Sequence, residues 1–218
     1  MNRSLVTFGD SWPAGSELTS DQHPFGYTLA KLLDASAYSN CAVPATSNEH
    51  MLLQLGEYAR QQRNIENHIA VFFITYPGRS CLIDYQGNFL EVRPDANADK
   101  NSREYLYFKY FHTPAQEKFK THQTILALQR MSAELKLQDF YIVGWVPDID
   151  LDWPGIDKNK FYNYGQTTCA EWLDIDPYNF EEEIRSSPFV RPNHCHPNQQ
   201  GHEIIAHKLY DWIKDKIV

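Results

Sequence analysis

Two short segments near opposite ends of the chain carry side chains that could perform acyl-transfer chemistry together. The first, Gly9-Asp10-Ser11, directly follows the apolar run Leu5–Phe8. A glycine lets the chain turn sharply off a strand. A serine at the start of the next helix would be exposed beside backbone N–H groups that can stabilise an oxyanion. The alternative interpretation is a plain turn in which the aspartate or the serine caps a helix.

The second segment is His194-Cys195-His196-Pro197-Asn198, which is followed by Gly201-His202. Proline holds the preceding residue in extended backbone and suits the first turn of a helix. His196 should therefore project from a loop, although a solitary histidine in such a place is often a surface or capping residue. His194 and His196 would point to the same side of an extended chain and could chelate zinc, but no second pair of ligands accompanies them.

Strand-like and helix-like segments alternate along the chain. The predicted strands are Leu5–Phe8, Tyr38–Val43, Ile69–Ile74 and Phe140–Val146, and the predicted helices are Phe25–Leu33, Ser47–Arg63, Ala115–Leu137 and Gln200–Lys216. The uninterrupted apolar run Ile69–Ile74 is typical of a strand buried on both faces of a parallel sheet. This alternation predicts one α/β domain, residues 1–218, folded as a three-layer α/β/α sandwich around a central parallel sheet.

Two stretches interrupt this alternation and are interpreted as insertions, at about 80–113 and 147–192. The first contains a predicted hairpin, Leu82–Tyr85 with Phe89–Val92, and an aromatic cluster, Tyr105–Phe111. The second is irregular and rich in Trp, Tyr, Asp and Pro. Loops of this length often build lids or binding surfaces, and ligands bind beyond the carboxyl ends of parallel strands. The aromatic rings could stack on sugars or could pack the insertions onto the sheet.

Taken together, Gly9-Asp10-Ser11 and His196-Pro197-Asn198 with Gly201-His202 resemble motifs of the SGNH (GDSL-like) hydrolase family, in order and spacing over nearly the whole chain. The resemblance implies a flavodoxin-like sandwich of the SGNH type and an esterase. In that enzyme Ser11 is the nucleophile, His196 is the general base, and an acyl-enzyme is cleaved by water. Asp10, Trp12 and Arg79 are then expected to contact the substrate.

The oxyanion-binding motifs depart from the family pattern. Ala45 stands where the family has a glycine, so the N–H groups of Ser11 and Ala45 form the oxyanion hole only if Ala45 has a negative φ. Thr75-Tyr76-Pro77-Gly78-Arg79 replaces the family's Gly-x-Asn-Asp. Thr75 or Arg79 would then supply the polar group that the family takes from asparagine.

The orienting acid is the largest departure. Asn193 stands three residues before His196, where the family has aspartate. Asparagine can orient an imidazole but cannot balance imidazolium charge, and the equivalent change in serine proteases lowers kcat by ~10⁴. Three outcomes stay open: a working Ser–His dyad, a carboxylate supplied from another loop, or an inactive enzyme. The loop acids considered are Asp148, Asp150 and Asp152, which could equally be solvated surface charges.

Composition narrows the class of partner. The chain has 218 residues and a formal net charge of −8, which disfavours binding to nucleic acid or to anionic membranes. Its longest apolar run is far shorter than a membrane span of about 20 residues, and no signal-peptide pattern opens the sequence. The 4 cysteines form no CxxC pair, which favours reduced thiols in the cytoplasm.

The leading hypothesis is therefore a cytoplasmic esterase, without cofactor or metal, that cleaves a small acyl ester such as an acetylated carbohydrate. The first alternative is a catalytically impaired binding protein on the same fold, because fold does not imply function. The second is a metal-dependent hydrolase that uses the His194-Cys195-His196 run.

Overall fold

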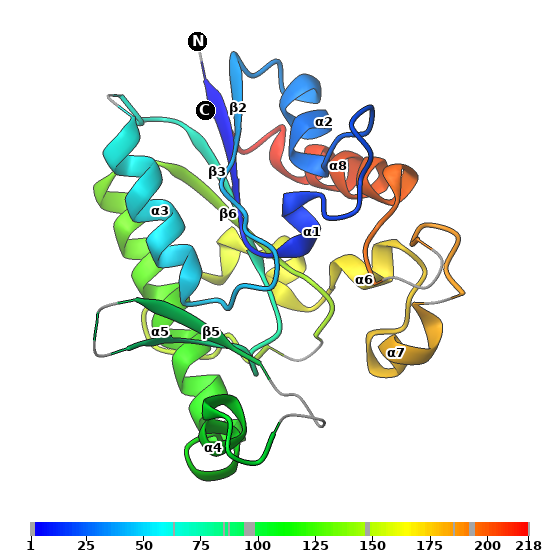
Figure 1. Ribbon diagram of the computed structural model, residues 1–218. Coiled ribbons are helices and arrows are strands. Elements are labelled where there is room, and N and C mark those ends of the chain that lie inside the picture. The colour runs from blue at the N-terminus through cyan, green and yellow to red at the C-terminus, as the bar shows by residue number, and fades with distance from the viewer. Residues whose placement is uncertain are drawn as a thin grey trace.

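The computed structural model describes residues 3–62, 64–84, 86, 88–93, 99–146, 149–184, 186–191 and 195–217. Its central sheet contains β1 (Ser4–Phe8), β2 (Ala37–Asn40), β3 (Ile69–Ile74) and β6 (Gln138–Val143) in the order β2-β1-β3-β6. All three neighbouring pairs are parallel, as the sequence predicts. The strands run side by side through the middle of the molecule (Figure 1).

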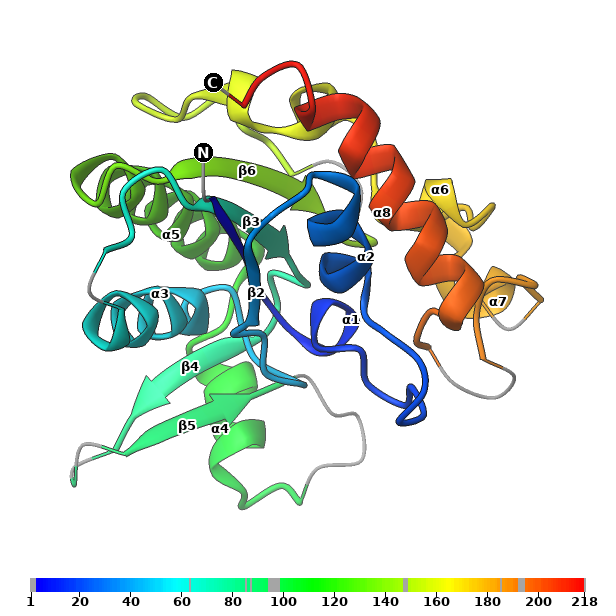
Figure 2. The same cartoon turned by 90° about the horizontal axis from the view of Figure 1, so that it is seen from above.

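Helices cover both faces of this sheet and make the predicted three layers. One face carries α2 (Phe25–Leu32) and α8 (Gln199–Ile213), and the other carries α3 (His50–Gln61) and α5 (Pro114–Glu134). Figure 2, seen from above, shows α3 and α5 on one side of the strands and α2 and α8 on the other. The predicted α/β/α sandwich is confirmed.

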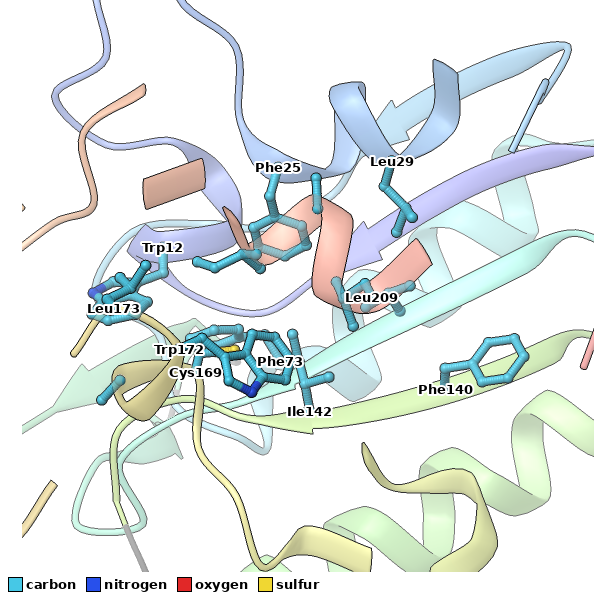
Figure 3. Close-up of a cluster of buried hydrophobic side chains, with 14 of the residues drawn as sticks. Trp12, Phe25, Leu29, Phe73, Phe140, Ile142, Cys169, Trp172, Leu173 and Leu209 are labelled. Carbon is cyan, nitrogen blue, oxygen red and sulfur yellow. The ribbon is translucent and has the colours of Figure 1, made fainter. Parts of the chain in front are cut away.

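The side-chain alternation of β3 explains why both faces are covered. Successive residues of a strand point to opposite faces, and all six residues of β3 are buried. Ile69, Val71 and Phe73 pack on the α2/α8 side, whereas Ala70, Phe72 and Ile74 pack on the α3/α5 side. On the first side, Phe73 lies among Trp12, Phe25 and Leu209 from three other elements (Figure 3).

Several elements begin or end a few residues from their predicted limits. The helix predicted from residue 47 begins at His50, because the side chain of Asn48 is bonded to the backbone of Thr75. The last strand runs over Gln138–Val143, and the chain leaves the sheet after the N–H of Gly144 bonds to Ile74. Arg63, which would end the predicted third helix, lies outside the described residues.

The first insertion forms an antiparallel hairpin and an exposed helix. The hairpin consists of β4 (Ser80–Ile83) and β5 (Phe89–Val92), and it is separate from the main sheet. Tyr85 and Gly87 of the predicted hairpin lie outside the described residues. Most of the aromatic cluster lies on α4 (Arg103–Tyr110). Tyr105, Tyr107 and Phe108 are partly buried, so they help to pack the insertion, whereas Tyr110 and the following Phe111 are exposed.

The second insertion packs against the core. Its described part contains α6 (Cys169–Trp172), α7 (Phe180–Glu183) and 3₁₀ turns at Lys158–Lys160, Tyr162–Gly165 and Pro177–Asn179. The short helix α1 (Ser11–Ala14), from the N-terminal part of the chain, lies near this insertion. Leu173, Ile175 and Ile184 are buried in the cluster on the α2/α8 side. Much of this segment is therefore core. Among the helices of the described ranges, none is long and apolar enough to cross a membrane.

Candidate active site

Ser11 lies at the end of β1, where the chain turns into α1. Gly9 has φ +138°, and a Cβ there would lie 2.9 Å from Cβ of Phe73 and from Cγ of Pro13, so the turn requires glycine. Ser11 is the first residue of α1, as the motif predicts. It is only 7% exposed, whereas the sequence suggested an exposed serine. A substrate must therefore come close to this turn for its carbonyl group to reach the Ser11 hydroxyl.

Asp10 is fully buried and bonded on both carboxylate oxygens. Its Oδ1 accepts from the backbone N–H of Trp12 at 3.2 Å. Its Oδ2 accepts from the Thr75 hydroxyl at 2.5 Å and from Nη1 of Arg79 at 2.7 Å. The predicted substrate contact of Asp10 is wrong for this arrangement, because the side chain presents no surface to a ligand.

Trp12 is also buried, and it connects the two ends of the chain. The indole is 1% exposed, and its Nε1–H donates to the backbone oxygen of Cys195 at 2.8 Å. The predicted substrate contact of Trp12 is therefore wrong as well. This bond joins the residue after Ser11 to the residue before His196, so the serine and histidine segments are in contact.

Thr75 does not supply the predicted oxyanion donor. Its hydroxyl hydrogen is directed to Asp10. Its backbone N–H donates to Oδ1 of Asn48 at 2.8 Å, and its carbonyl oxygen accepts from Nδ2 of Asn48 at 3.1 Å. Through these bonds Thr75 holds the turn at Asp10 and the Asn48 side chain in place.

Arg79 has donors that the bond to Asp10 does not use. The guanidinium contacts Asp10 and the carbonyl oxygen of Thr46 through Nη1. Its side chain is 16% exposed, and its central carbon lies 5.5 Å from the centre of the Trp145 ring. Of the two replacements predicted for the family's asparagine, Arg79 is the one with N–H groups left for a ligand.

Ala45 does not meet the condition set for an oxyanion donor. Its φ is +66°, in the left-handed region, whereas the sequence argument required a negative value. That region costs a non-glycine residue roughly 1–2 kcal/mol. Neighbouring bonds impose the turn: the N–H of Val43 and the hydroxyl of Thr46 both donate to the Gly9 oxygen, at 3.0 and 3.3 Å.

The His196 segment is held by backbone pairing and by the last helix. The carbonyl oxygen of His196 accepts from the N–H of Arg191 at 3.1 Å, and Pro197 forms an isolated bridge with Val190. Asn198 caps α8 by accepting from the N–H of Gly201 at 3.0 Å. These contacts place His196 in the loop just before α8, as the proline predicts.

A carboxylate that the sequence did not indicate lies beside His196. Oε2 of Glu17 is 3.1 Å from Nδ1 of His196, and the two side chains are 30% and 22% exposed. Glu17 follows α1 and has φ +69°. No motif identifies it, and its only sequence signal is that it comes six residues after Ser11.

Two of the three predicted loop acids form ion pairs with lysines, and the third lies outside the described residues. Asp150 is paired with Lys118, and Asp152 is paired with Lys158, so neither is the partner of His196. Their assignment as replacement acids is therefore wrong, and the interpretation as loop charges fits both. Asp148, Asn193 and His194 lie outside the described residues. The dyad oriented by Asn193 stays a prediction.

His202 has a structural role in this motif. Its Nδ1 accepts from the backbone N–H of Phe25 at 3.2 Å, which ties α8 to the start of α2. Burial is the main cause that lowers the pKa of His202 to about 3, so the ring is neutral near pH 7. Gly201 is required beside it, because a Cβ would lie 2.4 Å from the Phe189 oxygen.

Comparisons with known proteins support the fold. No family model and no curated protein matches the chain. Among solved structures, TesA has a TM-score of 0.52 at 11% identity, covering 98% of this chain and 99% of TesA. A mutant of Axe2, an acetyl-xylooligosaccharide esterase from Geobacillus, has a TM-score of 0.49 at 13% identity, covering 97% and 94%.

A lipolytic protein of the G-D-S-L family from Veillonella parvula has a TM-score of 0.48 at 14% identity, covering 96% of this chain and 97% of that protein. At these identities the likeness concerns the fold. The chain therefore shares its α/β architecture with TesA over almost the full length of both proteins.

We predict that Arg79→Met destabilises the protein by about 2–4 kcal/mol, because it leaves the Asp10 charge buried without its cation. Urea unfolding measures this change. Asp10→Asn with Arg79→Met should recover part of the loss, because the double variant has no unpaired charge. Arg60→Met, which breaks the exposed pair with Glu57, should barely change the unfolding midpoint. Equal effects of the two arginine variants would refute the buried-pair argument.

We predict that Ala45→Gly stabilises the protein by about 0.5–1 kcal/mol, because glycine adopts a positive φ without strain. Thermal and urea unfolding measure the gain. Ala59→Gly, inside α3, should have the opposite sign, with a loss of about 1 kcal/mol. A loss of stability in Ala45→Gly would contradict the left-handed conformation.

Proposed function

We propose that this chain is a divergent SGNH hydrolase, an esterase that cleaves small acyl esters through an acyl-enzyme on Ser11. The observation that carries the proposal is the hydrogen bond between the Trp12 indole and the Cys195 oxygen. It joins the segments that hold Ser11 and His196, which lie far apart in the sequence. The shared fold agrees with this activity, although fold alone does not establish it.

In the proposed reaction, Oγ of Ser11 attacks the ester carbonyl carbon while Nε2 of His196 takes the hydroxyl proton. The tetrahedral intermediate then expels the alcohol, which receives that proton from His196. Water, deprotonated by the same imidazole, cleaves the acyl-enzyme and releases the carboxylic acid. The backbone N–H of Ser11 and the guanidinium of Arg79 are the proposed partners of the oxyanion.

Glu17 is the proposed orienting acid in place of the family's aspartate. A carboxylate at Nδ1 keeps the ring proton on that nitrogen, which leaves Nε2 free to accept from Ser11, and it stabilises the imidazolium that forms. The contact at 3.1 Å is on the nitrogen that this role requires, and it is an ion-pair contact without hydrogen-bond geometry, so the two side chains must realign to form the bond. Because both side chains are partly exposed, solvent screens the pair, and its contribution should be smaller than that of a buried acid.

An aromatic groove next to Trp145 supports an acylated carbohydrate as the substrate class. The groove has a volume of about 600 Å³ and is lined by Tyr76, Trp145, Val146, Pro177, Tyr178, Asn179, Phe180 and Glu182. The Trp145 ring lies 5.4 Å from the Trp12 ring, so the groove begins close to Ser11. Exposed rings such as Tyr178 offer flat apolar surfaces for sugar stacking.

A non-catalytic binding protein on this fold is the second candidate. The left-handed Ala45 and the bonded hydroxyl of Thr75 favour it, because Ala45 fails the backbone condition set for an oxyanion donor and the Thr75 hydroxyl hydrogen is used by Asp10. The groove would then bind the acylated sugar without cleaving it. Enzyme and binder differ in whether Ser11 reacts.

We predict that Ser11→Ala lowers kcat for p-nitrophenyl acetate by at least about 10³-fold with the fold intact, because the nucleophile is lost. Circular dichroism and the unfolding midpoint check the fold. Ser186→Ala, at an exposed serine, should keep full activity. A fluorophosphonate probe should label the parent on Ser11. A parent that neither hydrolyses the ester nor reacts with the probe is a binder, and an active Ser11→Ala variant excludes Ser11 as the nucleophile.

We predict that Glu17→Gln lowers kcat about 10–100-fold and leaves KM within about twofold, because the carboxylate orients His196 and does not touch the substrate. Asp21→Asn is the matched control, since Asp21 lies on the same loop and bonds Thr19. Adding Glu17→Gln to Ser11→Ala should cause no further loss. An unchanged kcat in Glu17→Gln would mean that Asn193 orients His196 or that the Ser–His dyad works alone, while Ser11 chemistry stands.

A further inference from the structure

Three side chains that metal ions favour meet on the α3/α5 side of the molecule, outside the proposed active site. His50 is the first residue of α3, Cys81 lies in β4, and Glu91 lies in β5. One donor atom from each lies within 4.8 Å of the others. Cys81 and Glu91 are directly opposite each other in the hairpin register, so their side chains share one face.

We propose that His50, Cys81 and Glu91 bind a Zn²⁺ ion through Nδ1, Sγ and a carboxylate oxygen, with water as the fourth ligand. One nitrogen, one sulfur and one oxygen donor form a set that zinc accepts in tetrahedral geometry. A thiolate and a carboxylate together balance the charge of the ion. This site does not depend on the proposed esterase activity.

The distances fit a site that needs only small adjustments. Tetrahedral zinc with ordinary bond lengths places neighbouring donor atoms about 3.3–3.7 Å apart. Nδ1 of His50 and Oε1 of Glu91 are 2.7 Å apart, as a hydrogen-bonded pair, and the full set lies within 4.8 Å. The ion would replace the hydrogen bond, pushing the pair slightly apart and drawing the sulfur in.

The surroundings hold the ligands and leave an entry route. The second carboxylate oxygen of Glu91 accepts from the backbone N–H of Ser47 at 3.0 Å, which fixes the orientation of the carboxylate. Lys120, the nearby cation, is 3.2 Å from Glu49 and so is already paired. The side chains of His50 and Glu91 are 22% and 25% exposed, so an ion can reach them from solvent.

The same three residues could also form a site in which Cys81 is a nucleophile. The negative charge beside Cys81 disfavours the thiolate that such a nucleophile needs. Burial and the adjacent Glu91 carboxylate raise the pKa of Cys81 to about 12, so without a cation the thiol is protonated and unreactive. A divalent ion reverses this balance, because it is attracted by the carboxylate and deprotonates the thiol.

The ion would connect the insertion to the main domain. An isolated two-stranded hairpin is only marginally stable in water. Within the described residues, β4 and β5 pair only with each other. The site would tie both strands to the start of α3, and through Ser47 to the segment between β2 and α3. Its effect is therefore expected on the stability of the hairpin.

The test is zinc binding to full-length protein that has been stripped with a chelator and dialysed. Competition against a chromophoric chelator should give one Zn²⁺ per chain. Cobalt should give the charge-transfer absorption of a thiolate ligand. Cys81→Ser and His50→Ala should each weaken zinc binding by at least about 100-fold and remove that absorption. Zinc should also raise the unfolding temperature of the parent and not of these variants.

Two controls distinguish this site from the His194-Cys195-His196 run and from the proposed catalytic centre. Cys195→Ser changes an exposed cysteine in that run and should keep the parent affinity. Ser11→Ala should also keep it, which makes the result independent of catalysis. Binding lost in Cys195→Ser and kept in Cys81→Ser would move the zinc to the other run and overturn the proposal. Binding of no zinc by folded parent protein would overturn it as well.

Discussion

The buried charge of Asp10 is the constraint on which the candidate site depends. A carboxylate without solvent must be satisfied by protein donors, and here the donors come from three places. Trp12 lies in the first turn of α1, Thr75 follows β3, and Arg79 precedes β4. Satisfying one carboxylate therefore fixes the turn that carries Ser11 against the end of the neighbouring strand. It also explains why Thr75 cannot serve the oxyanion.

The second constraint is the buried indole of Trp12. A buried N–H needs an acceptor, and the Cys195 oxygen provides it. The same ring packs with Phe73 and Trp145, so the bond extends from the core to the loop before α8. Once that loop is in place, His196 lies beside Glu17, which comes from the chain just after α1. In this arrangement α1 and the residues just after it supply both the proposed nucleophile, Ser11, and the proposed acid, Glu17.

The segment between β2 and α3 connects this site to the proposed zinc site. Asn48 pairs with the backbone of Thr75, and Ser47 donates to Glu91. Asn48 thus contacts the residue that follows β3, and the adjacent Ser47 contacts the β4–β5 hairpin. The strained turn at Ala45 lies in the same segment. The first insertion is consequently connected by short polar contacts to the edge of the sheet that carries the proposed active site.

The amino-acid sequence by itself determined the layers and pointed to the two segments that carry the proposed active site. The apolar run Ile69–Ile74 and the alternation of strands and helices are local patterns, and Gly9 and Pro197 impose their turns through their own backbone limits. Only the tertiary structure decided which carboxylate meets His196, where the Thr75 hydroxyl points, and that His50, Cys81 and Glu91 converge. Such contacts join residues far apart in the chain, and no periodicity or spacing encodes them. They form only once the layers have packed and have brought distant segments together, and the buried bond between Thr75 and Asp10 follows because buried polar groups need partners.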